Sequence, residues 1–368
     1  MPTVIERLLL CSLITAGCAK DYEIVPKAPD VDPGEVTPCG FTTIPGTKLS
    51  EYDCNPVFDG SGEDWGEYVG SVGFHTVEIL GHPFYQIWYT ATPDEEDSGW
   101  WGLGYAMSDE GTDWEAHPSN PVMESMSSTW DEDGMTGLDV VWDPTGGRYV
   151  VTYQGLKYDN FGGLASLGFG VATSDDGVRW SPHPDNPVID FMVDDGYPSI
   201  CWPLTVSAND GGGFTGYMAA RSAADDDACQ IYAAQSDDLS EWTLLDRPVV
   251  EGNSDDFDFM GSVGADIVKL GGTQYLFYVG FAEWESHGSY RTASTSTLSL
   301  ATSDNGISWS KHGENPLPIG RTDEGRVSAV AAQVVGERIH LWVTDYYPEL
   351  GRSAVGYYLF EPGGPVHE

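Results

Sequence analysis

One seven-residue phrase recurs four times along this chain and constrains the fold more than any other feature. Each copy opens with Ser-Asp and closes with Trp, and the copies cover residues 108–114, 174–180, 236–242 and 303–309. A second phrase, Asn-Pro-Val or a close variant, follows each copy at residues 120–122, 186–188, 247–249 and 315–317. A repeat at roughly 65 residues indicates an array of equivalent supersecondary units.

Three sets of short strand-like segments accompany the repeats. A glycine-rich, small-residue set covers 69–75, 133–139, 201–206, 260–266 and 327–335. An aromatic and β-branched set covers 84–90, 148–154, 214–220, 274–279 and 338–344. A third set leads into the Ser-Asp phrase at 102–107, 167–173, 230–235 and 298–302, with 354–360 as a fifth copy. Such runs, bounded by turn residues, predict β-strands.

These sets predict an all-β fold, a five-bladed β-propeller of four-stranded antiparallel blades over residues 39–368. The glycine-rich strands suit the crowded position nearest the axis, and the Asn-Pro-Val phrases predict the outermost strand, where proline is tolerated. The Trp of each phrase is expected to fill the gap between blades. No Ser-Asp phrase follows the fifth unit, so the segment near residues 55–58 is expected to complete the last blade and close the ring.

The N-terminus reads as a targeting segment. Arg7 precedes a short apolar stretch at residues 8–16, and Thr15-Ala16-Gly17-Cys18 resembles a bacterial lipobox. We therefore expect residues 1–17 to be a signal peptide, Cys18 to be lipidated, and the proline-rich residues 18–38 to be a disordered linker. The protein would be exported and lipid-anchored at the cell envelope or surface. A plain signal peptide cut nearby is the alternative.

Export makes disulfides plausible. Setting Cys11 and Cys18 aside leaves four cysteines, which allow three pairings. Proximity in the sequence favours Cys39–Cys54 and Cys201–Cys229.

The chain carries 58 acidic and 16 basic residues, a formal charge of −42. A surface this negative repels nucleic acid and anionic lipid, so we expect neither as a partner, apart from the lipid anchor. A monomer is expected. No nucleotide, redox or haem motif occurs, and no His/Cys spacing indicates a metal site. A structural calcium ion is only weakly suggested, by the acidic runs 225–227 and 255–256, because neither matches an EF-hand loop.

The phrases resemble those of the arabinanase, levansucrase and invertase superfamily, which includes glycoside hydrolase families 43, 32 and 130. The resemblance covers about residues 50–362 and is carried by Gly104–Asp109, and by Ala172–Gly177 with Trp180 and Asn186-Pro187-Val188. It implies a five-bladed propeller that acts on polysaccharides or oligosaccharides. It also implies a base Asp where this chain has His75, an acid Glu early in blade 3 where this chain has Tyr197–Pro203, and a pKa-tuning Asp at Asp139.

In such a propeller, first strands begin and second strands end on one face, where several carboxylates would converge. Residues 69–75, 133–139 and 260–266 align without gaps, which places His75, Asp139 and Asp266 at equivalent positions, and Leu204 and Gln333 take that place in the other two units. The second strands end at Thr92, Gln154, Arg221, Glu283 and Asp345, with aromatic walls from Trp65, Trp202 and Trp284. Carboxylates bind sugar hydroxyls while aromatic faces stack on sugar rings.

Glycoside hydrolysis needs two carboxyls flanking the bond. We expect Glu283 as acid and Asp139 or Asp266 as base, with substrate contacts from His75, Gln154, Trp202, Arg221 and Asp345. Because the family's usual trio is not intact, a non-catalytic glycan-binding lipoprotein on the same scaffold is the main alternative. A protein-binding propeller is a third hypothesis. In a purely structural interpretation, Asp139 and Asp266 anchor backbone N–H groups around the axis.

Overall fold

The computed structural model describes residues 39–60, 68–79, 82–92, 102–125, 129–158, 164–190, 200–209, 211–222, 225–252, 257–287, 290–319 and 327–363. This part of the chain forms 24 strands and no helix. It therefore contains no helix that could span a membrane. The strands pair antiparallel except for a single parallel bridge between Cys229 and Gly261.

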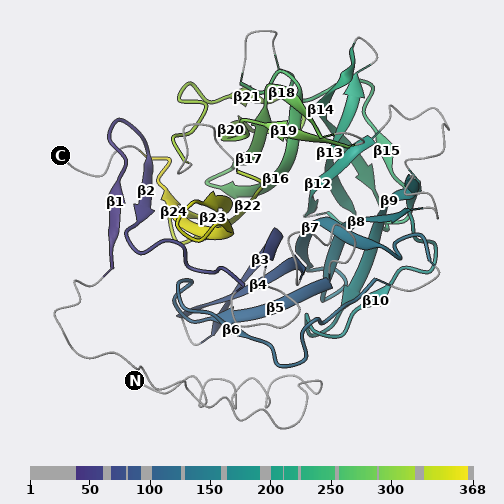
Figure 1. Ribbon diagram of the computed structural model, residues 1–368, viewed down its shortest axis with the longest axis horizontal. Helices are drawn as coiled ribbons and strands as arrows, with labels where there is room; N and C mark the ends of the chain where they lie inside the picture. Colours follow the sequence, from purple (N-terminus) through teal and green to yellow (C-terminus); the bar gives the residue numbers. More distant parts are fainter. Residues whose placement is uncertain are drawn as a thin grey trace.

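Consecutive strands pair into meanders that are arranged around a common centre (Figure 1). The first meander comprises β3 (Tyr68–Ile79), β4 (His82–Thr92), β5 (Gly102–Ser108) and β6 (Glu115–Ala116). The second comprises β7 (Gly134–Asp143), β8 (Arg148–Tyr158), β9 (Leu164–Ser174) and β10 (Ser181–Pro182), and β11 (Ile189–Asp190) also pairs with β9. The third comprises β12 (Ile200–Ala208), β13 (Phe214–Ser222), β14 (Asp225–Ser236) and β15 (Thr243–Leu244).

The fourth meander comprises β16 (Gly261–Leu270), β17 (Thr273–Phe281), β20 (Thr297–Ser303) and β21 (Ser310–Lys311). A separate hairpin, β18 (Glu283–His287) and β19 (Tyr290–Ser294), lies between β17 and β20 in the chain. The last sheet comprises β22 (Ala329–Val335), β23 (Arg338–Tyr347), β24 (Arg352–Phe360), β2 (Leu49–Tyr52) and β1 (Phe41–Thr43). The innermost strands make contacts in the cyclic order β3, β7, β12, β16, β22 and back to β3, so they enclose one axis.

The repeated Ser-Asp phrase is a turn between the third strand of a meander and its outermost strand. In the second meander, the hydroxyl of Ser174 accepts a hydrogen bond from the N–H of Gly177 at 2.8 Å. Gly177 has a φ of 75°, a conformation that glycine adopts without strain. The indole N–H of Trp180 then donates to the carbonyl of Gly177 at 3.1 Å. The glycine and the tryptophan of the phrase therefore both suit the geometry of this turn, although the third copy adopts it with Leu239 at a φ of 75°.

The same turns connect neighbouring meanders. Hydrogen bonds run from a second-strand aromatic side chain to a turn glycine carbonyl of the next meander: Trp88 to Gly177 at 2.7 Å, Tyr217 to Gly306 at 2.9 Å and Trp342 to Gly111 at 3.1 Å. Ring centroids of Trp180 and Trp88 lie 6.3 Å apart, and those of Trp309 and Tyr217 lie 5.7 Å apart. These contacts confirm that the phrase tryptophans pack between units.

The Asn-Pro-Val phrases do not form the outermost strand, which is a correction to the sequence prediction. That strand is only two residues long and follows the phrase Trp directly, as at Glu115–Ala116. Asn120 lies beyond it, and its side chain bonds both the N–H and the C=O of Tyr105, at 2.9 and 3.1 Å. Because proline has no N–H to give to the ladder, the Asn side chain makes these bonds instead. Asn186 and Asn315 do the same with Val171 and Leu300.

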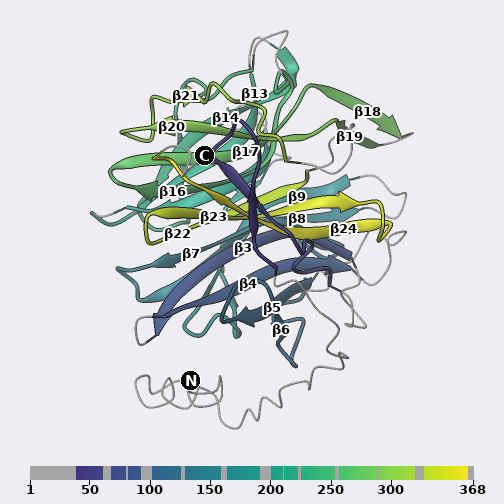
Figure 2. The ribbon, with the colours of Figure 1, turned by 90° about the vertical axis from the view of Figure 1, so that its left-hand side faces the viewer.

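The N-terminal segment completes the last sheet, as the sequence predicts. Strand β2 pairs with β24, and Phe58 forms a bridge with Val355. Asn55 bonds the N–H and C=O of Tyr357 at 2.7 and 3.2 Å, which repeats the arrangement of the other Asn-Pro phrases. Figure 2 shows these purple N-terminal strands against the yellow C-terminal ones. Strand β1 extends this sheet beyond what the sequence predicts.

Candidate functional site

Two aspartates from distant parts of the chain lie together near the axis. Asp139 in β7 and Asp266 in β16 are 7% and 8% exposed. Between them stands Thr205 of β12, whose hydroxyl oxygen is 2.9 Å from Oδ2 of Asp139 and 3.3 Å from Oδ1 of Asp266. A hydroxyl has one proton to donate, so it serves one carboxylate at a time. We call Asp139, Thr205 and Asp266 the axial clasp.

Backbone N–H groups also donate to both carboxyls, some from neighbouring strands and one from the strand of Asp266 itself. The N–H of Val206 donates to Oδ2 of Asp139 at 2.8 Å. The N–H groups of Ile267 and Ala332 donate to Oδ1 and Oδ2 of Asp266, both at 2.6 Å. Asp139 thus ties β7 to β12, Asp266 ties β16 to β22, and Thr205 joins the two halves. These contacts agree with the structural interpretation of both aspartates.

The axial clasp favours protonated carboxyls. Burial raises the pKa of Asp139 from 3.8 to about 6, against the opposing effect of the hydrogen bonds from Val206 and Thr205. Burial also raises the pKa of Asp266 well above its usual range, and the charge of Asp139 adds to that rise. Two buried carboxyls that compete for one hydroxyl donor repel each other when both are ionised. The pair therefore retains a proton to a higher pH than an exposed aspartate does.

The inner-strand residues at the level of the clasp follow from the strand register. Asp139 pairs with Thr152 of β8, Thr205 with Tyr217 of β13 and Asp266 with Phe277 of β17. Each of these second-strand residues lies three positions after the residue that pairs with the phrase serine of the same meander. In β4 the same position is Trp88, and its partner is Gly73. A Cβ added to Gly73 would lie 2.9 Å from the nitrogen of Val140, much as the Asp139 side chain faces that of Val206. Gly73 is therefore the counterpart of Asp139.

This register corrects the gapless alignment, which placed His75 level with Asp139. His75 pairs instead with Gln86, two residues further along the inner strand than Gly73. The physical reason is hairpin length. The β3–β4 hairpin closes with the pair Ile79–His82, whereas the β7–β8 hairpin closes with Asp143–Arg148 and has a longer connection.

The alignment also needs correction in the third meander, where Thr205 takes the place expected for Leu204. Strand β12 has irregular pairing between Ile200 and Trp202 and again between Pro203 and Thr205. Each irregularity changes which residue faces the axis. The sequence carries no marker for this, since neither a threonine nor a bulge stands out against the glycine-rich background. Thr205 is thus the site residue that sequence reasoning missed.

Glu283, the expected acid, has different surroundings from the clasp aspartates. It begins β18, is exposed, and pairs with Ser294 across the separate β18–β19 hairpin. Figure 2 shows this hairpin extending from the edge of the molecule. The structure thus brings Asp139 and Asp266 into one buried network and leaves Glu283 accessible to solvent. The role of Glu283 as an acid remains a prediction.

Arg221 and Asp345 lie near the ends of β13 and β23 as expected, whereas β8 continues past Gln154 to Tyr158. Gln154 is buried, and its amide donates to the carbonyl of Cys201 at 3.2 Å. Asp345 is buried and accepts from the N–H of Tyr346 at 2.8 Å. Arg221 is exposed near the end of β13. Their contact with substrate remains a prediction.

Both predicted disulfides are present: Cys39–Cys54 and Cys201–Cys229. The second joins the start of β12 to β14. The side chains of His75 and Trp202, and the whole of Cys18, lie outside the described part of the chain. So do the side chains of both acidic runs considered for calcium. Within the described residues, no group of three or more His, Cys, Asp or Glu could hold a metal ion.

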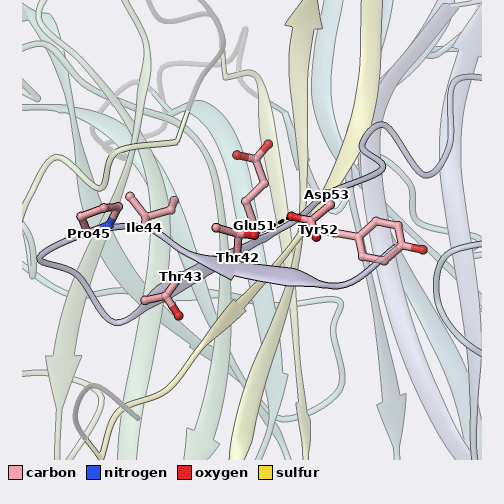
Figure 3. Close-up of a pocket in the computed structure, with 7 residues that line it drawn as sticks. All are labelled: Thr42, Thr43, Ile44, Pro45, Glu51, Tyr52 and Asp53. Atoms are coloured by element: carbon pink, nitrogen blue, oxygen red, sulfur yellow. Dashed lines mark hydrogen bonds between the residues drawn. The ribbon is translucent and has the colours of Figure 1, made fainter. Parts of the chain in front are cut away.

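One cavity lies on the β1–β2 hairpin and another between the third and fourth meanders, and the axial clasp lines neither of them. The larger, about 430 Å³, lies on the β1–β2 hairpin and is lined by Thr42–Pro45 and Glu51–Asp53 (Figure 3). The hydroxyl of Thr42 donates to Asp53 across it at 2.7 Å. Since one hairpin alone forms this cavity, it is not the predicted funnel. The smaller, about 260 Å³, lies between the third and fourth meanders.

No family model matches the chain, and no curated protein matches it significantly. Solved structures, in contrast, do match the chain. A glycosyl hydrolase from Bacteroides ovatus has a TM-score of 0.60 at 16% identity, and the match covers 89% of this chain and 95% of that protein. An N-acetylgalactosamine deacetylase from F. plautii, in complex with blood group B trisaccharide, gives 0.61 at 16% identity, with 85% and 95% covered.

A thermostable family-43 glycoside hydrolase has a TM-score of 0.57 at 18% identity, and the match covers 83% of this chain and 96% of that protein. This chain has the β-propeller fold of the glycoside hydrolases. The resemblance predicted from the Ser-Asp phrases is thereby confirmed at the level of fold, which is all that identities this low establish.

Proposed function

We propose that this protein is an exported, lipid-anchored β-propeller of five four-stranded blades that binds a glycan where the second strands end. The fold that it shares with carbohydrate-active proteins supports this proposal. So do Gln154, Arg221 and Asp345 in the second halves of three second strands, because amides, guanidinium groups and carboxylates are the groups that bind sugar hydroxyls. Residues 1–17 would be the signal peptide, Cys18 the lipid attachment site and residues 18–38 the linker.

The state of the axial clasp is the observation that favours binding over cutting. Hydrolysis needs two carboxyls roughly 5–10 Å apart with the glycosidic bond between them. In the clasp, one threonine hydroxyl stands between Asp139 and Asp266, and backbone N–H groups donate to both carboxyls. No sugar can lie between these two carboxyls. Their role in this proposal is to hold the blades in place under a glycan-binding face.

Hydrolysis is the second candidate, and the exposed carboxylate of Glu283 favours it. In that case Glu283 would protonate the leaving oxygen. A second carboxylate would have to supply the base, since Asp139 is held within the clasp.

The test is a screen of arabinan, fructan, xylan and mannan fragments, with thermal unfolding and reducing-sugar release measured side by side. We expect one fragment class to raise the melting temperature without release of reducing ends. Arg221→Ala should abolish the rise in melting temperature. Arg179→Ala, which removes an exposed arginine from a Ser-Asp turn, should leave that rise intact. Release that disappears in Glu283→Gln would establish the hydrolase instead. A flat response to all four classes would contradict both.

A further inference from the structure

The smaller cavity lies on the face of the molecule opposite the second-strand ends. It is bordered by Ser207 near the end of β12, Thr215 near the start of β13 and Gln274 near the start of β17. Its volume, about 260 Å³, is just below the roughly 300–1,000 Å³ of typical ligand pockets, so it suits a small ligand. None of its lining residues is charged, although the chain has a net charge of −42.

The corresponding space between the first and second meanders is filled. There the ring of Trp88 lies 5.1 Å from that of Tyr105 and 5.3 Å from that of Tyr149. Gln86 joins the two tyrosines, accepting from the hydroxyl of Tyr149 at 2.9 Å and donating to that of Tyr105. Large side chains and two hydrogen bonds therefore close this junction.

The strand registers identify the residues that replace this set between the third and fourth meanders. Tyr149 and Gln274 both pair with a phrase serine, Ser174 and Ser303. Counted from the residue that pairs with the phrase serine, Gln86 corresponds to Thr215 and Trp88 to Tyr217. Tyr105 likewise corresponds to Ala233, and Tyr149 to Gln274. Every replacement is smaller. The cavity therefore results from smaller side chains at strand positions of these two repeats and not from the placement of a loop.

Gln274, which lines the cavity, also carries an unsatisfied acceptor. The side-chain oxygen Oε1 of Gln274 is buried and has no hydrogen-bond partner in the described structure. The neighbouring hydroxyls are engaged, since Tyr217 donates to the carbonyl of Gly306 at 2.9 Å and Thr215 donates to Asn209 at 3.0 Å. A buried acceptor without a partner destabilises the folded state, and a hydroxyl donor would remove that penalty. The uncharged lining disfavours an ion, because a buried charge needs a partner.

We propose that this cavity binds one ring of a neutral sugar, with a ligand hydroxyl donating to Oε1 of Gln274. Apolar wall comes from Leu245 and Ile267, and further polar groups from Ser207 and Gln235. The site lies away from the second-strand ends, and its ligand class is argued from its own lining. It therefore stands or falls independently of the glycan-binding face proposed above.

The experiment titrates the isotope-labelled protein with methyl glycosides of glucose, galactose, mannose and arabinose and follows the amide resonances. We expect saturable shifts of the Gln274 side-chain amide and the Gly306 N–H with at least one probe. Gln274→Tyr and Ala233→Tyr, which restore the residues of the filled junction, should abolish these shifts. Gln274→Met, which keeps the length but removes the acceptor, should weaken binding about fivefold, the equivalent of one neutral hydrogen bond.

Asp304→Asn is the matched control, an exposed change on the same turn that does not line the cavity. It should leave the shifts unchanged, as should Arg221→Ala, which affects the other face only. Thermal unfolding of each variant checks that it folds. No saturable shift with any of the four probes would overturn the proposal. So would shifts that persist in whichever tyrosine variant folds.

Discussion

Asp139→Asn removes one ionisable group of the axial clasp and keeps its shape. The new carbonyl can still accept from the N–H of Val206. In the folded protein the pKa of Asp139 is raised from 3.8 to about 6, so the folded state binds this proton more tightly than the unfolded state. The stability that this carboxyl contributes is therefore complete below pH 3.8 and is lost as the pH rises through about 6.

The magnitude follows from the size of the pKa rise. At 1.36 kcal/mol per pH unit, the free energy of unfolding falls by about 3 kcal/mol between pH 3.8 and pH 7 because of this group. Asp139→Asn avoids that loss. We expect the variant to match the wild type near pH 4 and to exceed it by up to about 3 kcal/mol at pH 7. For a domain of this size that is roughly 4–5 °C in melting temperature.

Urea unfolding, followed by tryptophan fluorescence from pH 4 to pH 7.5, measures the difference directly. Asp143→Asn is the control, because Asp143 is also buried but pairs with Arg148 at 3.5 Å and accepts two turn N–H groups. It should gain nothing at pH 7. If Asp139→Asn loses as much stability at pH 7 as Asp143→Asn does, the ionised carboxylate of Asp139 stabilises the fold through its hydrogen bonds, and the argument from burial is wrong.

Three further changes probe contacts within and between repeats. Asn315→Ala removes both bonds to Leu300 and should lower the free energy of unfolding by about 2 kcal/mol, measured by urea titration; an unchanged midpoint would show that water replaces the amide. Trp342→Phe removes the indole hydrogen bond to the first meander and should lower the free energy of unfolding by about 1 kcal/mol, in addition to the effect of lost packing. A smaller decrease would show that this hydrogen bond does not stabilise the contact between the meanders. Replacing Cys201 and Cys229 together by Ala should lower the free energy of unfolding by about 2–4 kcal/mol in urea titration; an unchanged midpoint would show that this disulfide does not stabilise the fold.

The repeated phrases allowed the turns to be predicted because their geometry is local. Ser174 and Gly177 are close in the chain, and the hydrogen bond between them needs only the intervening residues. The closure by residues 55–58 was also predictable, since an Asn-Pro phrase occurs there and a phrase was missing at the end. The outermost strand was misplaced because the bonds of the Asn120 side chain to Tyr105 leave no trace in strand propensity.

The candidate site was only partly predictable. Sequence symmetry correctly singled out Asp139 and Asp266 as inner-strand carboxylates. It could not reveal that Thr205 stands between them, or that His75 lies two residues from the level of Asp139, because hairpin length and bulges set the register. The cavity at Gln274 was equally hidden until the registers showed which residues correspond.

The sequence by itself determined the repeat, the turn chemistry and the closure of the last sheet by the N-terminal segment, since each depends on residues near one another in the chain or on symmetry between copies. Tertiary structure alone decided the environment of each carboxylate. Burial against backbone N–H groups from neighbouring strands made Asp139 and Asp266 a clasp, while Glu283 stayed in solvent. Burial and hydrogen-bond partners depend on how separate sheets pack against each other, and no local pattern in the chain encodes that packing.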